Sequence, residues 1–239
     1  MMYGFGIGFS PSNRLFSGGG ANPLWDGLQA YYTADSTPND ALGTYNGTLV
    51  NGATYGTGII NQGFSLDGVN DTVNIGNVLD NNGTQAMSWS LWVNFSSSPV
   101  FDALLAKYSG GTGYYITMTN TNRVQFGIGE TLTSNAIRVY SAPVLTTSTW
   151  YHVVITYDGS KLASGIKIYV NDSNTTVYIN YDTFTGSSSS TNILQLGRAS
   201  LGGNYFNGIL DEISIYNRVL TSIEVTELYN SGAGKQYTI

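Results

Sequence analysis

The stretch LQLGRASLGGNYFNGILDEISIYNRVLTSIEVTELY, residues 194–229, decides the fold. Between residues 208 and 217 it has the two-residue period of an extended strand, which places Ile209, Asp211, Ile213 and Ile215 on one side. Asp211 is the polar exception on that face. A carboxylate turned toward a core needs hydrogen-bond donors or a cation as partners.

A short helix is predicted directly after this strand. Thr221 and Glu224 have the spacing of a capping box, in which each side chain binds an exposed backbone N–H group of the other residue. Leu220 and Val225 are spaced to form the accompanying hydrophobic staple. Gly232 offers a left-handed stop, so the helix should end shortly before it.

The composition indicates one β domain and excludes several kinds of site. The chain has 239 residues, with 18 Tyr, 30 Gly and only 10% charged residues, a mixture typical of β structure. The net charge of −6 and the scattered Lys and Arg argue against nucleic-acid binding. No apolar run approaches the roughly 20 residues of a membrane span. Without Cys, disulfides and thiolate chemistry are excluded.

Residues 1–24 differ from the rest and are predicted to form an assembly arm, followed by one domain over residues 25–239. Tyr3, Phe5, Ile7 and Phe9 alternate with glycines, so an extended chain would carry all four on one face. Such an arm can dock on neighbouring subunits. There are two alternatives: the arm packs on its own domain, or the segment is a loose Gly-rich tail. The N-terminus lacks the basic leader and continuous apolar segment of a conventional secretory signal.

From residue 28 onward, short strand candidates recur between turn signals, which is the cadence of an antiparallel sandwich. The predicted strands are Leu28–Thr33, Gly47–Asn51, Gly63–Leu66, Thr72–Ile75, Met87–Phe95, Ala103–Tyr108, Tyr114–Thr119, Arg123–Gly129, Ile137–Ser141, Trp150–Tyr157, Ile166–Asn171, Val177–Tyr181 and Ile193–Gly197.

Four passages, GFSLDGVNDTVNIG, MSWSLWVNF, WYHVVITYDGSKLASGIKIYVND and LGRASLGGNYFNGILDEISIYNRVLTSIEVTELY, together resemble a laminin-G-like domain of the concanavalin A-like lectin/glucanase superfamily. The resemblance implies an all-β jelly roll of two antiparallel sheets with ligand-binding loops. Members bind glycans or proteins, often with calcium, and some relatives are glycosidases or lyases. The Gly/aromatic arm resembles, in composition only, the N-terminal assembly arms of phage virion proteins.

Catalysis is not expected. Glycoside cleavage needs two carboxylates flanking the scissile bond, and the Glu-x-Asp-x-x-Glu motif of the glucanase branch is absent. His152 is the only histidine, which excludes His-clustered metal sites. A Ser-His-Asp triad stays open from sequence, but no G-x-S-x-G elbow supports it. We therefore expect a structural histidine and no enzyme activity.

Calcium is the expected cofactor, if there is one. The resemblance implies a structural ion between the early loop and the last long strand, which here involves Asp35 and Asp211. Asn207, where the family commonly has Asp, weakens such a site. The alternative is that Asp211 accepts backbone N–H groups and Asp67 caps a turn.

Glycan binding would use aromatic faces together with amide, hydroxyl or guanidinium groups. The candidates are Trp92, Tyr108, Tyr114, Tyr157, Arg198, Asn204 and Tyr205. An exposed tyrosine that binds nothing is the plain alternative for each of them in so tyrosine-rich a chain.

The sequence thus favours a non-catalytic glycan- or surface-binding module displayed on a larger assembly. A phage virion surface is the expected setting, or otherwise an extracellular location reached without a conventional signal. The expected partners are neighbouring subunits and a glycan or cell-surface ligand, without nucleic acid or membrane insertion. A purely structural decoration protein and a polysaccharide-degrading enzyme are the alternatives.

Overall fold

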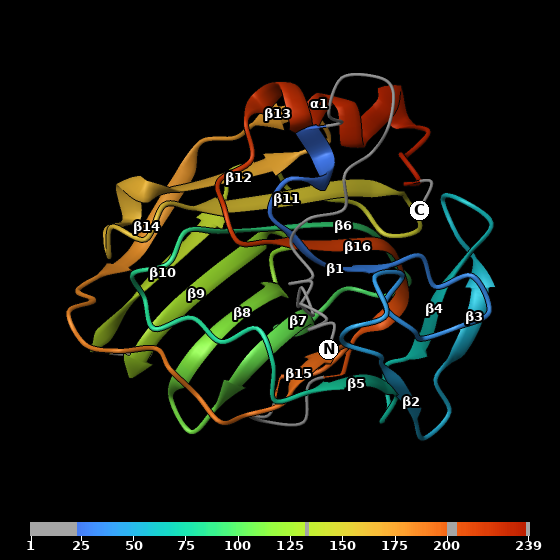
Figure 1. The fold of residues 1–239 in the computed structure, drawn as a ribbon, viewed down its shortest axis with the longest axis horizontal. Helices are drawn as coiled ribbons and strands as arrows, with labels where there is room; N and C mark the ends of the chain where they lie inside the picture. Colours follow the sequence, from blue (N-terminus) through green and yellow to red (C-terminus); the bar gives the residue numbers. More distant parts are fainter. Residues whose placement is uncertain (1–22, 132–133, 200–204, 238–239) are drawn as a thin grey trace, which may run out of the picture.

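Two antiparallel sheets stack face to face in the computed structural model, which describes residues 23–131, 134–199 and 205–237 (Figure 1). Sheet I contains β1 (Leu28–Tyr32), β3 (Thr54–Thr57), β4 (Gln62–Asp67), β6 (Met87–Phe95), β11 (Tyr151–Tyr157), β12 (Ile166–Val170), β13 (Ser173–Asn174) and β16 (Asn207–Tyr216). Sheet II contains β2 (Thr48–Val50), β5 (Thr72–Gly76), β7 (Asp102–Ser109), β8 (Thr112–Met118), β9 (Val124–Thr131), β10 (Asn135–Ser141), β14 (Val177–Asp182) and β15 (Leu194–Leu196). The predicted jelly-roll sandwich is confirmed.

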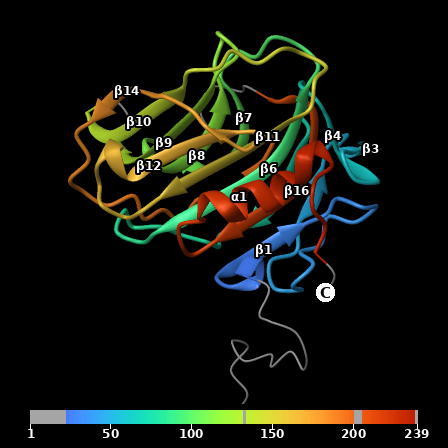
Figure 2. The same ribbon diagram turned by 90° about the horizontal axis from the view of Figure 1, so that it is seen from above.

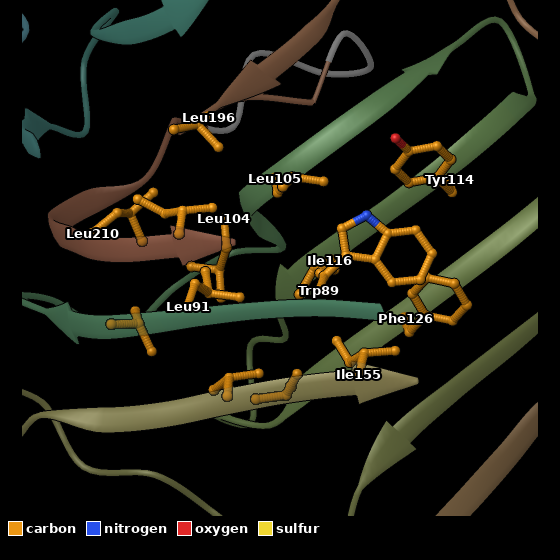
Figure 3. Packing of buried hydrophobic residues seen from close by; sticks show 14 of the residues in the cluster. Trp89, Leu91, Leu104, Leu105, Tyr114, Ile116, Phe126, Ile155, Leu196 and Leu210 are labelled. Atoms are coloured by element: carbon orange, nitrogen blue, oxygen red, sulfur yellow. The ribbon is translucent and has the colours of Figure 1, made fainter. Parts of the chain in front are cut away.

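The core lies between the sheets and follows the two-residue period of the strands. On β6, Trp89, Leu91 and Val93 all face it and are fully buried. Figure 3 shows Trp89 beside Tyr114 and Phe126, with ring centroids 5.0 and 5.2 Å away. These aromatic contacts join β6 of one sheet to β8 and β9 of the other.

The outer face of sheet I is covered by α1 (Ser222–Tyr229), which crosses β6 and β16 (Figure 2). A second apolar cluster fills this layer and includes Tyr216, Val225 and Leu228. Leu24, assigned to the arm from sequence, is a fully buried member of the cluster and so belongs to the domain.

The ends of α1 follow local sequence. Thr221 accepts a hydrogen bond from the Glu224 N–H, and Glu224 accepts one from the Thr221 N–H at 2.7 Å, so the predicted capping box is confirmed. The helix ends at Tyr229, and its C-cap Asn230 is left-handed with φ 49°, two residues before the predicted left-handed stop at Gly232. None of the helices in the described ranges is long and apolar enough to cross a membrane.

A β-bulge in β16 breaks the predicted alternation. Asp211 pairs with Trp92 and Ser214 with Ser90, so β16 has one residue more than β6 over this interval. Glu212 takes up the extra residue with φ 48°. The bulge turns Leu210 and Ile213 toward the core. The prediction that Asp211 shares the face of Ile213 is therefore wrong.

Candidate functional site

The outer face of sheet II is the surface on which a site can form. The α-helix of the described chain lies on sheet I, so it leaves this face without a helical cover (Figure 1). The inward residues of β8 and β9, such as Ile116 and Phe126, belong to the core. Their neighbours Tyr115 and Gln125 therefore point outward.

Strand pairing arranges the outward side chains in two rows across the sheet. The first row runs through Ala103, Thr117, Gln125, Tyr140 and Tyr178, which are successive register partners. The second row runs through Asn74, Gln195, Ala106, Tyr115, Gly127, Arg138 and Tyr181. Aromatic, amide and guanidinium groups thus alternate with alanine and glycine, and Ala103 and Ala106 are buried in a cluster with Tyr108 and Tyr115.

A groove of about 450 Å³ lies at the β14 end of this face. It is lined by Phe101, Thr119, Asn120, Thr121, Arg123, Gln125, Arg138, Tyr140, Tyr178 and Asn180. These residues come from β9, β10, β14, the position just before β7 and the turn between β8 and β9. The groove is therefore built on paired strands, which hold its walls in place.

One wall of the groove is a pair of aromatic rings. The centroids of Tyr140 and Tyr178 lie 5.4 Å apart with 30° between the ring planes. Tyr178 is 46% exposed, so part of its ring meets solvent. Aromatic faces of this kind pack against the C–H surface of a ligand, and neighbouring polar groups then set its orientation.

Two arginines supply the charge of the groove. The Arg123 guanidinium lies 5.6 Å from the centre of the Tyr178 ring, and its Nη1 donates to the backbone carbonyls of Ser141 and Ala142. The Arg138 guanidinium lies 4.9 Å from the centre of the Tyr181 ring. Both cations are thus held by cation–π contacts or backbone carbonyls.

The groove has binding groups but no acid–base pair. None of the ten lining residues is Asp or Glu, and none is His. Asp102, next to the lining residue Phe101, is buried and accepts a hydrogen bond from the Val100 N–H, and burial raises its pKa. This arrangement can hold a polar ring through stacking and hydrogen bonds.

Three predicted glycan residues are buried elsewhere, so these predictions are wrong. Tyr114 and Tyr157 point into the core, where their hydroxyls donate to the carbonyls of Leu79 at 2.8 Å and Gly83 at 2.6 Å. Trp92 lies under α1 and stacks on Tyr229, with centroids 5.7 Å apart. The packing of sheet I against the helix accounts for this tryptophan on the polar side of its strand.

The other four candidates belong to sheet II or its edge. Tyr108 is on the outer face but is buried beside Tyr115, with centroids 5.5 Å apart, so its prediction as a ligand residue is wrong. Arg198 and Tyr205 form an isolated bridge, with the guanidinium 5.2 Å from the ring centre. They are half-buried, outside the groove, and remain predictions. Asn204 lies outside the described residues.

The carboxylates of Asp35 and Asp211 do not fit a calcium ion. Asp211 Oδ2 accepts from the Ile59 and Ile60 N–H groups at 2.9 and 3.1 Å, and its Oδ1 accepts from the Glu212 N–H. The Asp35 carboxylate likewise accepts hydrogen bonds from three donors, which are Asn61 Nδ2, Gln62 N and Gln236 Nε2. N–H dipoles thus point at the oxygens that a cation would need. The alternative expectation is confirmed, with Asp67 capping its turn through the Val69 N–H.

His152 is a structural residue. Its Nε2 shares a 2.8 Å hydrogen bond with Ser90 Oγ, but both residues are about 1% exposed. The ring lies 5.1 Å from that of Trp92. Burial lowers the pKa of His152 to about 3, so the imidazole is neutral at pH 7. No substrate can reach this serine and histidine.

None of the ten lining residues was predicted as a ligand residue from sequence, including Arg123, Gln125, Arg138, Tyr140, Tyr178 and Asn180. Alternation in the predicted strands separates each outward residue from its inward neighbours. It does not say which strands become neighbours or which face is covered by the helix. The exposed Tyr178 on a polar edge strand is the signal that comes nearest to identifying the site.

The laminin G model of the concanavalin A-like lectin/glucanases superfamily matches residues 67–226, more than half of the sequence. The chain belongs to this superfamily. No curated protein matches the sequence. The matched range contains all of the residues that line the groove.

Solved structures of similar fold include a domain of an arabinanase and the binding domains of toxins. Domain 4 of AbnA, a GH43 extracellular arabinanase from Geobacillus stearothermophilus solved with arabinotriose, has a TM-score of 0.59 and 21% identity, over 84% of this chain and 97% of that domain. The receptor binding domain of botulinum neurotoxin D has a TM-score of 0.63 and 14% identity, over 87% of this chain. The binding domain of Paraclostridial Mosquitocidal Protein 1 has a TM-score of 0.65 and 13% identity, over 81% of this chain. The chain spans about half of each toxin domain, 53% and 49% respectively.

Proposed function

We propose that this laminin-G-like domain is a non-catalytic glycan-binding module that binds its ligand in the groove on sheet II. The observation that carries the proposal is the Tyr140–Tyr178 ring pair beside the amides of Gln125 and Asn180. A sugar ring can pack against the exposed part of the Tyr178 ring while the amides bind its hydroxyl groups. The related arabinanase domain, solved with a trisaccharide, supports a saccharide as ligand.

Hydrolysis is not proposed, because cleavage of a glycosidic bond needs two suitably spaced carboxyl groups. The groove lining contains none. The adjacent carboxylates Asp211 and Glu212 are at most 5% exposed and lie on sheet I, the other sheet of the sandwich. The domain is therefore proposed to recognise its ligand without changing it.

Binding to immobilised polysaccharides and a glycan array tests the proposal. Tyr178→Ala should weaken binding at least about tenfold, since it removes the exposed ring on which the sugar stacks. Ile179→Ala is the matched control, because Ile179 is the next residue on the same strand, is 59% exposed and does not line the groove. Equal binding by the wild type and Tyr178→Ala would contradict the proposed site.

The setting of the domain is a separate proposal that comes from sequence alone. Tyr3, Phe5, Ile7 and Phe9 lie outside the described residues, and we propose that they attach the domain to neighbouring subunits of a virion surface. Removing residues 1–22 should leave the melting temperature unchanged and abolish co-sedimentation with the assembly. Retained co-sedimentation would favour another attachment surface.

A further inference from the structure

We propose that the groove on sheet II selects anionic saccharides, with the Arg123 guanidinium as the principal anion-binding group and Arg138 beside it. This inference rests on the proposed function, because it names the ligand class of the same groove. It concerns the charge of the ligand, which neither the stacked rings nor the amides determine.

The distribution of charge in the molecule supports this inference. Acidic residues outnumber basic ones by 15 to 9 in the chain. The groove reverses this excess, because two arginines and no Asp or Glu line it. In a protein of net charge −6, a local positive surface of this kind is where a polyanion can approach.

The contacts of Arg123 orient its guanidinium for bidentate binding. The Nη1 group donates to the carbonyls of Ser141 and Ala142, and the plane packs near the Tyr178 ring. Within the described residues, Arg123 forms no salt bridge, and its Nε and Nη2 groups make no hydrogen bond. The Nε–Nη2 edge of a guanidinium matches the two oxygens of a carboxylate or sulfate.

Arg218, unlike Arg123, forms salt bridges within the domain. Its guanidinium is bound to the carboxylate of Glu224 and lies 3.7 Å from that of Asp26. Arg123 instead donates to backbone carbonyls and lines the groove. Because these hydrogen bonds already restrict the Arg123 side chain, it loses little conformational entropy when a ligand binds.

The anion can be a carboxylate of a uronic or nonulosonic sugar, or a sulfate ester. A guanidinium binds both, and five polysaccharide probes separate them. The probes are polygalacturonate, the same polymer after carboxyl reduction, dextran sulfate, unmodified dextran and linear arabinan. Affinity gel electrophoresis or biolayer interferometry of the full chain measures each apparent Kd.

At least one anionic probe should bind about tenfold or more tightly than its neutral counterpart. Arg123→Gln should remove this difference, and Arg123→Lys should retain only part of it because the fork is lost. Lys167→Gln, which removes an exposed charge from sheet I, is the matched control and should bind like the wild type. Binding should also weaken as the salt concentration rises from about 0.05 to about 0.5 M. Over this range the Debye length becomes about threefold shorter, so the salt screens the attraction between the arginines and the anion.

The outcomes separate this inference from the proposed function. Tyr178-dependent binding of neutral and anionic probes with equal affinity would overturn anion selection and leave glycan binding intact. Absence of binding to every probe and to a glycan array would overturn both. Preference for polygalacturonate over its reduced form identifies a carboxylate, and preference for dextran sulfate over dextran identifies a sulfate. The reduction and salt comparisons need no variant, so they decide the question even if Arg123→Gln is unstable.

Discussion

Glu212 accepts a hydrogen bond from the hydroxyl of Tyr31, which lies 181 residues earlier in the chain and is likewise buried. The other carboxylate oxygen, Oε1, makes no hydrogen bond within the described residues. Asp211 precedes Glu212 at the bulge and Asp35 is near enough to repel both. Two adjacent carboxyl groups are therefore buried, and neither forms a salt bridge within the described residues.

This burial predicts that stability falls as pH rises toward 8. Burial raises the pKa of Glu212 to about 8, with Asp211 adding repulsion. The folded state then binds more protons than the unfolded state between the ordinary and the raised pKa, so the free energy of unfolding decreases as pH rises through this window. Glu212→Gln should flatten the decrease between about pH 6.5 and 8 and raise stability at pH 8 by up to a few kcal/mol. Melting curves across this range test it; Glu130→Gln, at an exposed site, should keep the wild-type slope.

His152 predicts the opposite slope on the acid side. Its pKa is lowered from 6.5 to about 3 by burial, so the unfolded state takes up a proton that the folded state excludes. Stability should thus be lost as pH falls from about 6.5 toward 3. His152→Gln should reduce this part of the slope, whatever its effect at pH 7. Urea denaturation at pH 4 and 7 measures the difference, and an unchanged slope would contradict a buried neutral imidazole.

The capping box of α1 should contribute measurably to stability. Thr221→Ala removes the side-chain acceptor for the Glu224 N–H and should cost about 1 kcal/mol. Thr221→Ser should retain most of this contribution. Thr226→Ala, at an exposed position in the same helix, should be neutral or slightly stabilising because alanine favours the helix. A loss at Thr226 as large as at Thr221 would show that the cap is not responsible.

The amide contacts of Asp35 and Asp211 predict that calcium does not stabilise the fold. A ligand that binds only the folded state must raise the melting temperature. We therefore expect equal melting temperatures in EDTA and in millimolar calcium. A lower value in EDTA that disappears in Asp211→Asn would instead place an ion at this carboxylate.

The Tyr115 ring packs directly over Gly127 on the outer face of sheet II. A Cβ added there would lie 2.3 Å from Cζ of Tyr115, so the ring must move. Gly127→Ala should cost about 1 to 3 kcal/mol through overpacking. Combining it with Tyr115→Leu, which shortens the opposing side chain, should recover part of that loss. Thermal denaturation of the single and double variants measures the coupling between the two positions.

The strands and the helix could be predicted from sequence because their signals are local. Hydrophobic alternation in residues 87–95 and the Thr221–Glu224 pair act over a few residues, and the structure has both where they were expected. The short strands β3 and β13 were missed because four and two residues hold too little pattern. The bulge at Glu212 was missed because it depends on the pairing of β16 with β6.

The site could not be predicted in the same way. Tyr114 and Tyr178 are both tyrosines on short strands, yet one is fully buried and the other is 46% exposed. Residue type and alternation are nearly the same for the two positions. Strand order decides between them, because it places Tyr114 between the sheets and Tyr178 beside Tyr140 on the uncovered face. Local patterns thus established which segments are strands and which side chains alternate. Only tertiary packing established which face meets solvent, because burial depends on neighbours that are distant in sequence.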